Sequence, residues 1–428
     1  MGRLKELFSG NWHFNAMFAL LLLAAVTLPL TNFLMMPIAV LLLLNWVSEW
    51  NWREKLQNLR AWKAAPALIC STLIFLMLIP GLLMSCNKSD AVSTFDCSLW
   101  IITAPLVLLT TKPSEFSRRH IAAALGFFVA GTVVHVLVIL AVAVCKFILT
   151  GQTRYFYYSP LSILKHPSYV SMYCSFSFFT ILAFISRYWS QLSSNKRIIL
   201  ILLMTLLLTS VVLLQSKAGL LVMFLLIFLW IVYHFCIVRK KIIAGIVIMA
   251  AMVAAVVVVF QSGWIRKNRV LESIQQVQER KSNPYGTGSS EMRLTLWKCA
   301  WEVSVENLPW GVGTGDGTEE LNLHALKKNY TNLIGRHYNA HCQYLQTLME
   351  TGVPGLLCLF AFCLYPLIIS IKRRDFLYFA FSLIVIINIA VECMLQVRAG
   401  TNFIPLANML LFLKCQTNDK ERDFCVKS

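Results

Sequence analysis

Long apolar runs constrain this chain more than any other feature of its sequence. The stretch from Phe14 to Trp46 has 33 residues and contains no Asp, Glu, Lys or Arg. As a single helix rising about 1.5 Å per residue it would reach roughly 50 Å, well beyond a hydrocarbon core about 30 Å thick. The stretch therefore predicts two membrane-spanning helices, with the break supplied by Pro29, Thr31 and Asn32.

The same reasoning, applied along the rest of the chain, predicts an all-α polytopic membrane protein. Hydrophobic residues make up 58% of the sequence and charged residues only 14%, a balance that excludes an ordinary soluble enzyme. Beyond the first two spans, the apolar runs predict ten more, at residues 66–86, 98–110, 121–149, 167–188, 197–214, 217–238, 242–260, 343–370, 375–395 and 402–415. About twelve spans result, and an even number places both termini on one side.

The distribution of Lys and Arg predicts which side that is. The side of the termini holds 22 of the 38 Lys and Arg residues, the opposite short loops hold six, and one long segment holds the other ten. Because basic residues are retained on the cytoplasmic side, the termini are predicted to be cytoplasmic. Retention also explains the formal net charge of +18. No basic patch with interleaved aromatic residues suggests nucleic acid, so membrane lipids are the expected surroundings.

One hydrophilic segment is far longer than the other loops and divides the chain into three parts. Residues 1–260 carry spans one to nine, residues 261–342 form the long segment, and residues 343–428 carry the last three spans and a cytoplasmic tail. By the charge count the long segment is a large loop on the outer face, between spans nine and ten. Function is therefore sought in this loop.

The outer loop contains an amphipathic helix pattern. Leu294, Trp297, Trp301 and Val305 recur at helical spacing, and Pro309 follows. Such a helix is expected to lie on the bilayer surface or on the helical bundle.

Several other patterns in the chain argue against a cofactor. The run from Gly311 to Gly317 lacks the Gly-Lys-[Ser/Thr] of a phosphate-binding loop, so it predicts a flexible loop rather than a phosphate cradle. The 13 cysteines lack metal-binding spacing, and no Asp-rich metal motif occurs on the outer side. We therefore expect no metal and no cofactor. Whether Cys86 and Cys97, which flank one short loop, form a disulfide is left open.

His341 is the candidate base. It lies where the outer loop returns to the membrane, on one helical stripe with Leu345, Leu348, Gly352 and Gly355. The glycines would let a neighbouring helix come close beneath it. A histidine at this boundary either serves as a base near neutral pH or only caps the helix.

Cations on the outer side are the candidate ligands for an anion. Arg293 shares a helix face with Trp297 and either binds a phosphate or extends its charge to the interface. Lys217, in a very short outer turn, is either an anion ligand or an anchor at the interface. Four further outer residues suggest recognition of a polyanionic lipid headgroup, or are solvated loop residues: Arg154, Arg336, His337 and Tyr338.

Three motifs occur in order along the chain: Arg293-x-x-x-Trp297, then Leu308-Pro309-Trp310-Gly311-Val312-Gly313-Thr314-Gly315, then Asn339-Ala340-His341-Cys342-Gln343-Tyr344-Leu345-Gln346 through Glu350-Thr351-Gly352-Val353-Pro354-Gly355. Together they resemble the O-antigen ligase and polymerase superfamily. Its core pattern, His-[Asn/Ser/Gln]-x9-Gly-x-x-[Gly/Thr/Tyr], is matched in spacing by His341, Gly352 and Gly355. The motifs cover about residues 200–370, and the twelve-span layout with one large outer loop resembles the ligase branch.

Two positions depart from the family pattern. Cys342 replaces the usual amide or hydroxyl after the histidine, and Lys217 stands where the family typically has the Arg of a Ser-Arg pair. Lysine keeps the charge but not the bidentate binding of phosphate.

The resemblance implies a periplasmic glycosyl transfer in the bacterial inner membrane. The donor would be a glycan on undecaprenyl diphosphate, and the acceptor a sugar hydroxyl on lipid A-core or on another glycan. By likeness to the family, His341 would activate the acceptor hydroxyl, while Arg293 and Lys217 would hold the diphosphate as it leaves. The step would be independent of metal and would invert the anomeric configuration.

Two alternatives stay open beside a ligase. A polymerase of O-antigen or another surface polysaccharide shares the motifs, although the single large outer loop favours a ligase. A transporter of polysaccharide or lipid-linked glycan is the non-enzyme alternative, since twelve spans is also a transporter layout. Ionisable residues inside the predicted spans are few, chiefly His135 and Glu392, which argues against transport.

The departure at Lys217 gives a first prediction. If Lys217 binds an anion by its charge, Lys217→Arg retains or raises turnover, because arginine keeps the charge and adds a planar fork. Lys217→Ala loses turnover because it removes the charge. Transfer activity at matched protein levels measures the difference. Equal activity of the two variants would make Lys217 an anchor only.

Overall fold

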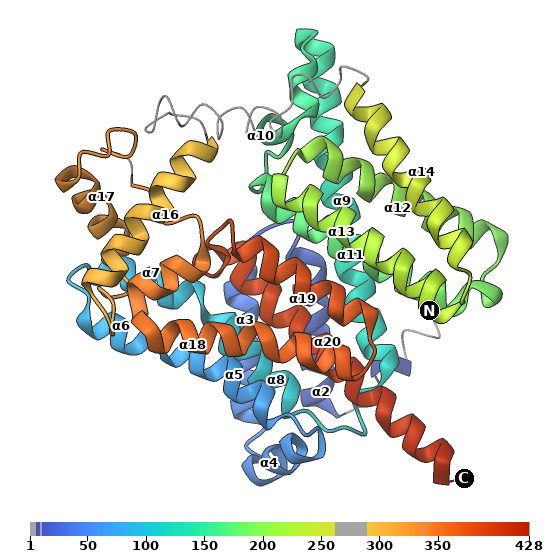
Figure 1. Cartoon of the computed structure of the whole chain (residues 1–428). Helices are drawn as coiled ribbons and strands as arrows, with labels where there is room; N and C mark the ends of the chain where they lie inside the picture. The colour runs from blue at the N-terminus through green and yellow to red at the C-terminus, as the bar shows by residue number, and fades with distance from the viewer. Residues whose placement is uncertain (1–5, 9–10, 262–288, 336, 428) are drawn as a thin grey trace.

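The computed structural model describes residues 6–8, 11–261, 289–335 and 337–427, and every regular element within these ranges is a helix (Figure 1). The first half of the chain forms η1 (Glu6–Phe8), α2 (Trp12–Thr27), α3 (Met35–Ser48), α4 (Trp52–Ala61), α5 (Ala65–Leu76), α6 (Leu78–Met84), α7 (Lys88–Cys97), α8 (Leu99–Leu109), α9 (Arg118–Thr150), η2 (Thr153–Phe156) and α10 (Tyr158–Leu161).

The second half forms α11 (Pro167–Tyr188), η3 (Trp189–Gln191), α12 (Ser194–Leu214), α13 (Lys217–Ile231), the π-helical η4 (Val232–Val238), α14 (Ile242–Gln261), α16 (Ser289–Glu306), α17 (Gly317–Lys327), α18 (Gln343–Lys372), α19 (Phe376–Ile389), η5 (Met394–Gln396) and α20 (Arg398–Lys427).

Helix lengths agree with a polytopic membrane protein. By length and composition, seven helical stretches of the described chain can cross a membrane: Ala65–Met84, Lys88–Leu109, Arg118–Thr150, Pro167–Gln191, Ser194–Leu214, Lys217–Phe235 and Gln343–Lys372. Four shorter apolar helices accompany them: Trp12–Thr27, Met35–Ser48, Ile242–Ala251 and Phe376–Ile389. Each of the twelve predicted spans overlaps a helix. The all-α membrane class is confirmed, whereas the number of spans and the outer loop remain predictions.

The break predicted between the first two spans lies at residues 28–34, between α2 and α3. Pro29 contributes its carbonyl oxygen to His135 of α9, whose Nδ1 lies 2.7 Å away. A polar side chain inside a span thus has a backbone partner, which is how polar groups persist at membrane depth.

Two helices, α11 and α20, lie inside the bundle. In the apolar part of α11 67% of residues are buried, and residues 399–413 of α20 are all buried, against 22% for α12, which lies at the periphery. Five aromatic rings from α9, α11, α19 and α20 pack against one another, with centroids 5.2–5.9 Å apart: Phe128, Tyr173, Phe176, Phe381 and Phe403. Large interlocking rings of this kind fix helices against one another in a membrane, where packing drives association.

Beyond the kink at Gly352, α18 exposes an apolar stripe. Val353, Leu357, Phe360 and Leu364 recur at helical spacing and are 38–61% exposed. A continuous apolar stripe on a long apolar helix is the face that lipid covers. The part of α18 after Gly352 therefore has the composition of a membrane span, with this stripe as the face expected to contact lipid.

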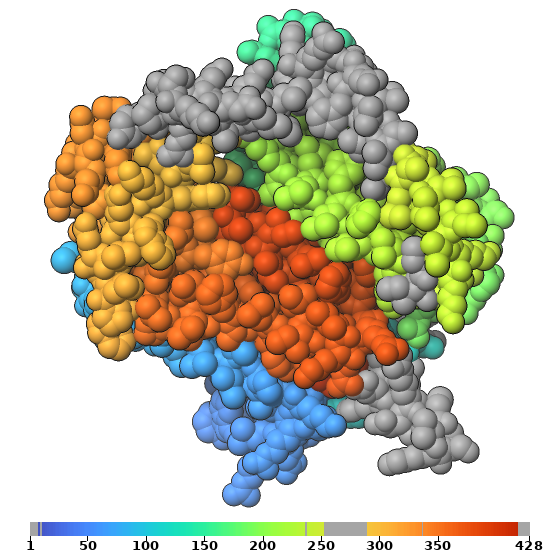
Figure 2. Space-filling model, in the orientation of Figure 1, coloured from blue at the N-terminus to red at the C-terminus, as the bar shows by residue number. Residues whose placement is uncertain are grey.

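At one end of the bundle, α16 and α17 build a second, smaller core against the start of α18 (Figure 2). Its members come from both helices and from the segment after α17: Leu296, Cys299, Ala300, Val303, Leu321, Ala325, Tyr330, Leu333, Ala340 and Met349. This core attaches the described part of the outer segment, residues 289–335 and 337–342, to the membrane bundle.

The predicted helix around Leu294 exists as α16, but the predicted stripe is not its buried face. The buried positions include Leu296, Cys299 and Val303, whereas Trp301 is 55% exposed. Cysteine, alanine and serine permit the close approach to α17 and α18, and the bulky tryptophan does not. Of the two expected environments for this helix, the structure shows the bundle, since α16 packs against α17 and α18 and leaves Trp301 exposed.

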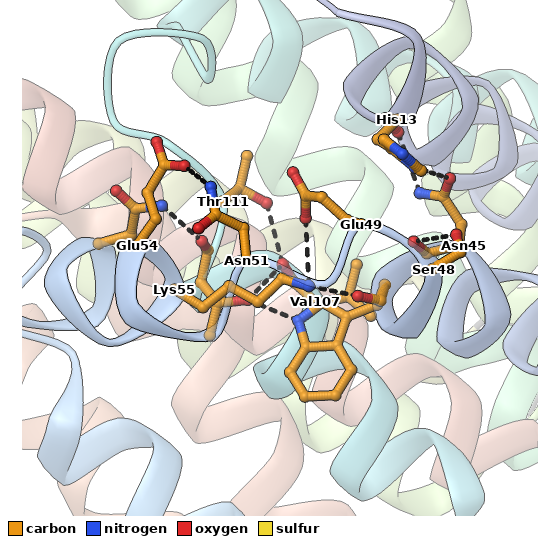
Figure 3. Close-up of polar contacts among 12 residues, drawn as sticks. His13, Asn45, Ser48, Glu49, Asn51, Glu54, Lys55, Val107 and Thr111 are labelled. Carbon is orange, nitrogen blue, oxygen red and sulfur yellow. Dashed lines mark hydrogen bonds and ion pairs between the residues drawn. The ribbon is translucent and has the colours of Figure 1, made fainter.

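A polar cluster at the other end of the molecule holds the short amphipathic helix α4 (Figures 1 and 3). The ammonium of Lys55 lies 3.2 Å from Glu49 and over the rings of Trp46 and Trp52. These contacts join α4 to the end of α3, and a second ion pair, between Glu54 and Lys112 at 2.7 Å, joins it to the loop after α8. The cluster is internally paired and positions α4.

Candidate functional site

Three segments that lie far apart in the sequence meet at the candidate site. They are α16, residues 337–342 before α18, and residues 390–397 between α19 and α20. The contact between α16 and α18 is visible in Figure 2, where the two helices lie directly against each other. One carboxylate, that of Glu392, connects all three segments.

The central contact joins His341 to Glu392. Nδ1 of the imidazole lies 3.0 Å from Oε1 of the carboxylate. Because an ionised carboxylate only accepts hydrogen bonds, Nδ1 carries the proton and donates, which leaves Nε2 as the basic nitrogen. Nε2 has no protein partner among the described residues, and the side chain of His341 is 27% exposed. Glu392 thus orients the imidazole through Nδ1, and Nε2 is left to accept a proton.

Backbone geometry aims this imidazole. His341 has a φ of +46°, in the left-handed region that non-glycine residues seldom adopt. Two side chains hold the strained turn: the backbone N–H of Ala340 donates to Gln346, at 2.7 Å, and the N–H of His341 donates to Asn339, at 3.1 Å. Strained backbone maintained by surrounding hydrogen bonds is common at functional sites.

Arg293 binds the other oxygen of the same carboxylate. Its Nη2 lies 3.3 Å from Oε2 of Glu392. One turn further along α16, Nε1 of Trp297 donates to the carbonyl oxygen of His341 at 3.4 Å. The predicted shared face of Arg293 and Trp297 is therefore real, and α16 directs Arg293 to Glu392 and Trp297 to the His341 turn. A guanidinium has five N–H donors, so this single bond leaves others for an anion.

The charge state of Glu392 follows from these contacts. Burial raises the pKa of Glu392, but the hydrogen bond from His341 and the electrostatic interactions with His341, Arg293 and His166 together lower it by more. The pKa of Glu392 therefore lies below its usual range, and the carboxylate is ionised at neutral pH.

Lys217 reaches the same helix from α13. Its Nζ lies 2.9 Å from Oγ of Ser290, three residues before Arg293 on α16. Residues three apart on a helix are neighbours, so the two predicted cations are attached to adjacent positions of one turn. The structure thus brings together His341, Arg293 and Lys217, which the sequence singled out separately.

The other predicted residues are less closely placed. Tyr338 packs its ring against His341, with centroids 5.9 Å apart. His337 is exposed, and Arg154 is exposed in η2 over the ring of Tyr155; in the described structure neither bonds to His341, Arg293 or Glu392. Arg336 lies outside the described residues.

The predicted helical stripe below His341 is wrong. His341 precedes α18, which begins at Gln343, and Gly352 interrupts the helix with a φ of +67°. A Cβ at Gly352 would lie 1.8 Å from the carbonyl oxygen of Pro309. The close approach that glycine permits is therefore that of the chain at residues 309–311, not of a neighbouring helix.

The glycine-rich run from Gly311 to Gly317 is not the flexible loop that the sequence predicted. The backbone N–H groups of Val312 and Gly313 donate to carbonyl oxygens of α18, at 2.8 and 3.0 Å. The carboxylate of Asp316 accepts the N–H groups of Cys86 and Asn87, both at 2.7 Å. The run is a strap between α18 and the start of α7, and these occupied N–H groups do not form a phosphate cradle.

Glu392 is the member of the site that sequence reasoning assigned no role there. The sequence contained a signal: Glu392 is the one carboxylate after an apolar run of 15 residues, Phe376–Ala390. An ionisable residue at a membrane edge is a functional candidate by default. Its partners could not be read from the sequence because they lie 51 and 99 residues away.

The described residues contain no group of three or more His, Cys, Asp or Glu side chains arranged to hold a metal ion. Cys86 and Cys97, whose pairing the sequence left open, are both free thiols.

One comparison with known proteins finds a family match in this region. Residues 199–360 match the family model for O-antigen ligases. The match spans α12 to most of α18, less than half of the chain, and includes Lys217, Arg293 and His341 but not Glu392. It supports the O-antigen ligase superfamily, as the motifs indicated. No curated protein matches the chain.

The depressed pKa of Glu392 predicts a pH-dependent contribution to stability. Replacing it by Gln removes a charge held by two partners, so we expect Glu392→Gln to lose about 1–3 kcal/mol of stability at pH 7. A depressed pKa gives stability that is present above the ordinary range of a glutamate and is lost as the pH falls through the folded value. The difference from wild type therefore persists from pH 7 down to about pH 4.5, the ordinary pKa of a glutamate, and shrinks only below it.

Thermal unfolding of the purified protein in detergent, followed between pH 7.5 and 3, measures this difference across the range in which it is lost. Glu319→Gln, on the exposed side of α17, is the control that leaves the midpoint unchanged at every pH. Identical midpoints for Glu392→Gln and wild type at pH 7 would contradict the assigned charge state.

Proposed function

We propose that this chain, a member of the O-antigen ligase superfamily, is a membrane glycosyltransferase that moves a glycan from a lipid-linked diphosphate to a sugar hydroxyl. The observation that carries the proposal is the oriented imidazole of His341, held by Glu392 beside Arg293. A base next to fixed cations suits a reaction in which a hydroxyl is deprotonated and a diphosphate departs. By family likeness, the donor is a glycan on undecaprenyl diphosphate and the acceptor is lipid A-core.

The proposed step is one displacement at the anomeric carbon. Nε2 of His341 takes the proton of the acceptor hydroxyl, and the oxygen forms a bond to the anomeric carbon as the bond from that carbon to the diphosphate oxygen breaks. The diphosphate leaves with the electron pair. Because attack and departure occur on opposite faces, the anomeric configuration is inverted.

Charge development explains the remaining residues. The imidazolium that forms on His341 is stabilised by the carboxylate of Glu392, which also fixes the tautomer. The leaving diphosphate accumulates negative charge, and Arg293 and Lys217 are placed to neutralise it. Fixed cations at the membrane edge stabilise a transition state most where water is partly excluded, so we propose a step that needs no metal. Tyr338, His337, Arg154 and Arg336 are proposed as outer contacts of the glycan or headgroup.

The charge distribution supports the proposed location. With the termini in the cytoplasm, the ends of the helices that carry Lys217, His341 and Glu392 face the periplasm of a bacterial inner membrane. The donor's diphosphate would then lie at the outer interface with its lipid in the bilayer.

A transporter is the less favoured alternative. The two ionisable residues that would mark a transport path are both engaged elsewhere: His135 binds the carbonyl oxygen of Pro29, and Glu392 binds His341 and Arg293. Between the two enzymes, the single large predicted outer loop favours the ligase over the polymerase.

The surface glycans of a deletion strain test this function. We expect bare lipid A-core on gels, with polymer retained on the lipid carrier, repaired by wild type but not by His341→Ala. His234→Ala, which changes a histidine of η4 stacked on Trp230, is the matched control and restores capping.

Other profiles would overturn part of the proposal. Core bearing a single repeat in the deletion strain would identify a polymerase. A normal glycan profile in the deletion strain would exclude both the ligase and the polymerase. Full complementation by His341→Ala would show that His341 is not the base.

A further inference from the structure

A buried carboxyl group, separate from the Glu392 cluster, accepts hydrogen bonds from two amides close to the candidate site. Glu350 of α18 is 6% exposed. Its Oε1 accepts two amide groups at once, from Nε2 of Gln346 and from Nε2 of Gln396, each at 2.7 Å. The two donors come from different elements, α18 and η5.

Each of these two amides also accepts a hydrogen bond from the loop that carries His341. With its N–H group turned toward Glu350, Gln346 presents Oε1 to the backbone N–H of Ala340, at 2.7 Å. Gln396 likewise presents Oε1 to Nδ2 of Asn339, at 3.4 Å. An amide has donors on one side and an acceptor on the other, so an acceptor at Glu350 dictates which side faces the loop.

The same junction fixes the segment that carries Glu392. Gln396 lies four residues after Glu392 and is bonded to Glu350. The neighbouring backbone N–H of Leu395 donates to Oε1 of Gln343, the first residue of α18, at 2.8 Å. The two halves of the His341–Glu392 pair are therefore attached, through neutral amides, to the first two turns of α18.

Glu350 has no direct bond to His341, Arg293 or Glu392 in the described structure, so it does not take part in the chemistry itself. It borders a small, partly polar cavity between α5, α8 and α18, together with Gln343, Thr347 and Gln396. A carboxyl group in such surroundings is retained for the geometry that it imposes on its partners.

We propose that Glu350 is a positioning residue: as a hydrogen-bond acceptor it orients the amides of Gln346 and Gln396, and these hold the His341 turn and the Glu392 segment in reacting register. The inference rests on the proposed function. This role needs a hydrogen-bond acceptor at the position of Oε1 of Glu350, and it needs neither a charge nor a transferable proton. A displacement of about 1 Å at a reacting group lowers rates by about 100-fold, so the effect falls on the chemical step.

The test compares two substitutions at position 350 in a transfer assay with purified protein and lipid-linked glycan. Glu350→Gln retains an acceptor oxygen, and we expect kcat within about threefold of wild type. Glu350→Leu removes the acceptor, and we expect kcat to fall about 10- to 100-fold with KM for the lipid-linked donor unchanged. Thr351→Val is the control in the same turn, since its Oγ bonds only to the carbonyl oxygen of Thr347, and it keeps wild-type kcat.

The outcomes separate the possible roles. Equal loss of activity in Glu350→Gln and Glu350→Leu would overturn the inference and make Glu350 a proton-transfer group. Wild-type kcat in Glu350→Leu would also overturn it. If Glu350→Leu fails to fold, Gln396→Leu removes one arm of the junction and must lower kcat at unchanged KM; wild-type kcat in that variant overturns the inference.

His341→Ala, measured alongside, separates this inference from the function on which it rests. An active His341→Ala variant refutes the proposed chemistry. An inactive His341→Ala variant with a fully active Glu350→Leu variant refutes only the positioning role.

Discussion

A single ionised carboxylate at the edge of the membrane organises this protein's candidate site. Glu392 binds His341 with one oxygen and Arg293 with the other, at 3.0 and 3.3 Å. The carboxylate is mostly buried, with 11% of its side chain exposed, so an ionised state requires both partners. His341 and Arg293 depend on Glu392 in turn, because the carboxylate orients the imidazole and holds the guanidinium beside it. Loss of the carboxylate would leave two basic groups facing each other.

The surrounding fold serves to bring these three side chains together and keep them there. Around Gly352, which has no side chain to obstruct it, the segment after α16 crosses α18 closely, and the strap at residues 311–317 joins α18 to α7. Beneath the site, neutral amides connect the His341 turn to Glu350. Such preorganised surroundings suit a reaction whose rate depends on charge placement. The exposed apolar stripe at Leu357 and Phe360, which is expected to contact lipid, lies beyond Gly352 on the other part of α18.

Some of this arrangement could be predicted from the sequence because it depends on local physics. Bilayer thickness limits helix length, so the helices and the break near Pro29 follow from the apolar runs alone. His341, Arg293 and Lys217 follow from motif spacing and from charge on the outer side. The rest depends on tertiary contacts. The face of α16 that is buried is set by α17 and α18, which select small residues rather than Trp301. Glu392 was visible as a carboxylate inside the predicted span 375–395, whereas α19 ends at Ile389 and leaves it beyond the helix. No local pattern could name its partners.

The account depends most on transfer by direct displacement beside Arg293. The measurement that tests it follows transfer from a purified lipid-linked glycan to acceptor by the reconstituted protein, with the anomeric configuration of the new bond determined by NMR. The account predicts inversion, and a loss in Arg293→Ala equivalent to about 2–4 kcal/mol of transition-state stabilisation at unchanged protein level. Retention of configuration, or wild-type rates in Arg293→Ala, would contradict it.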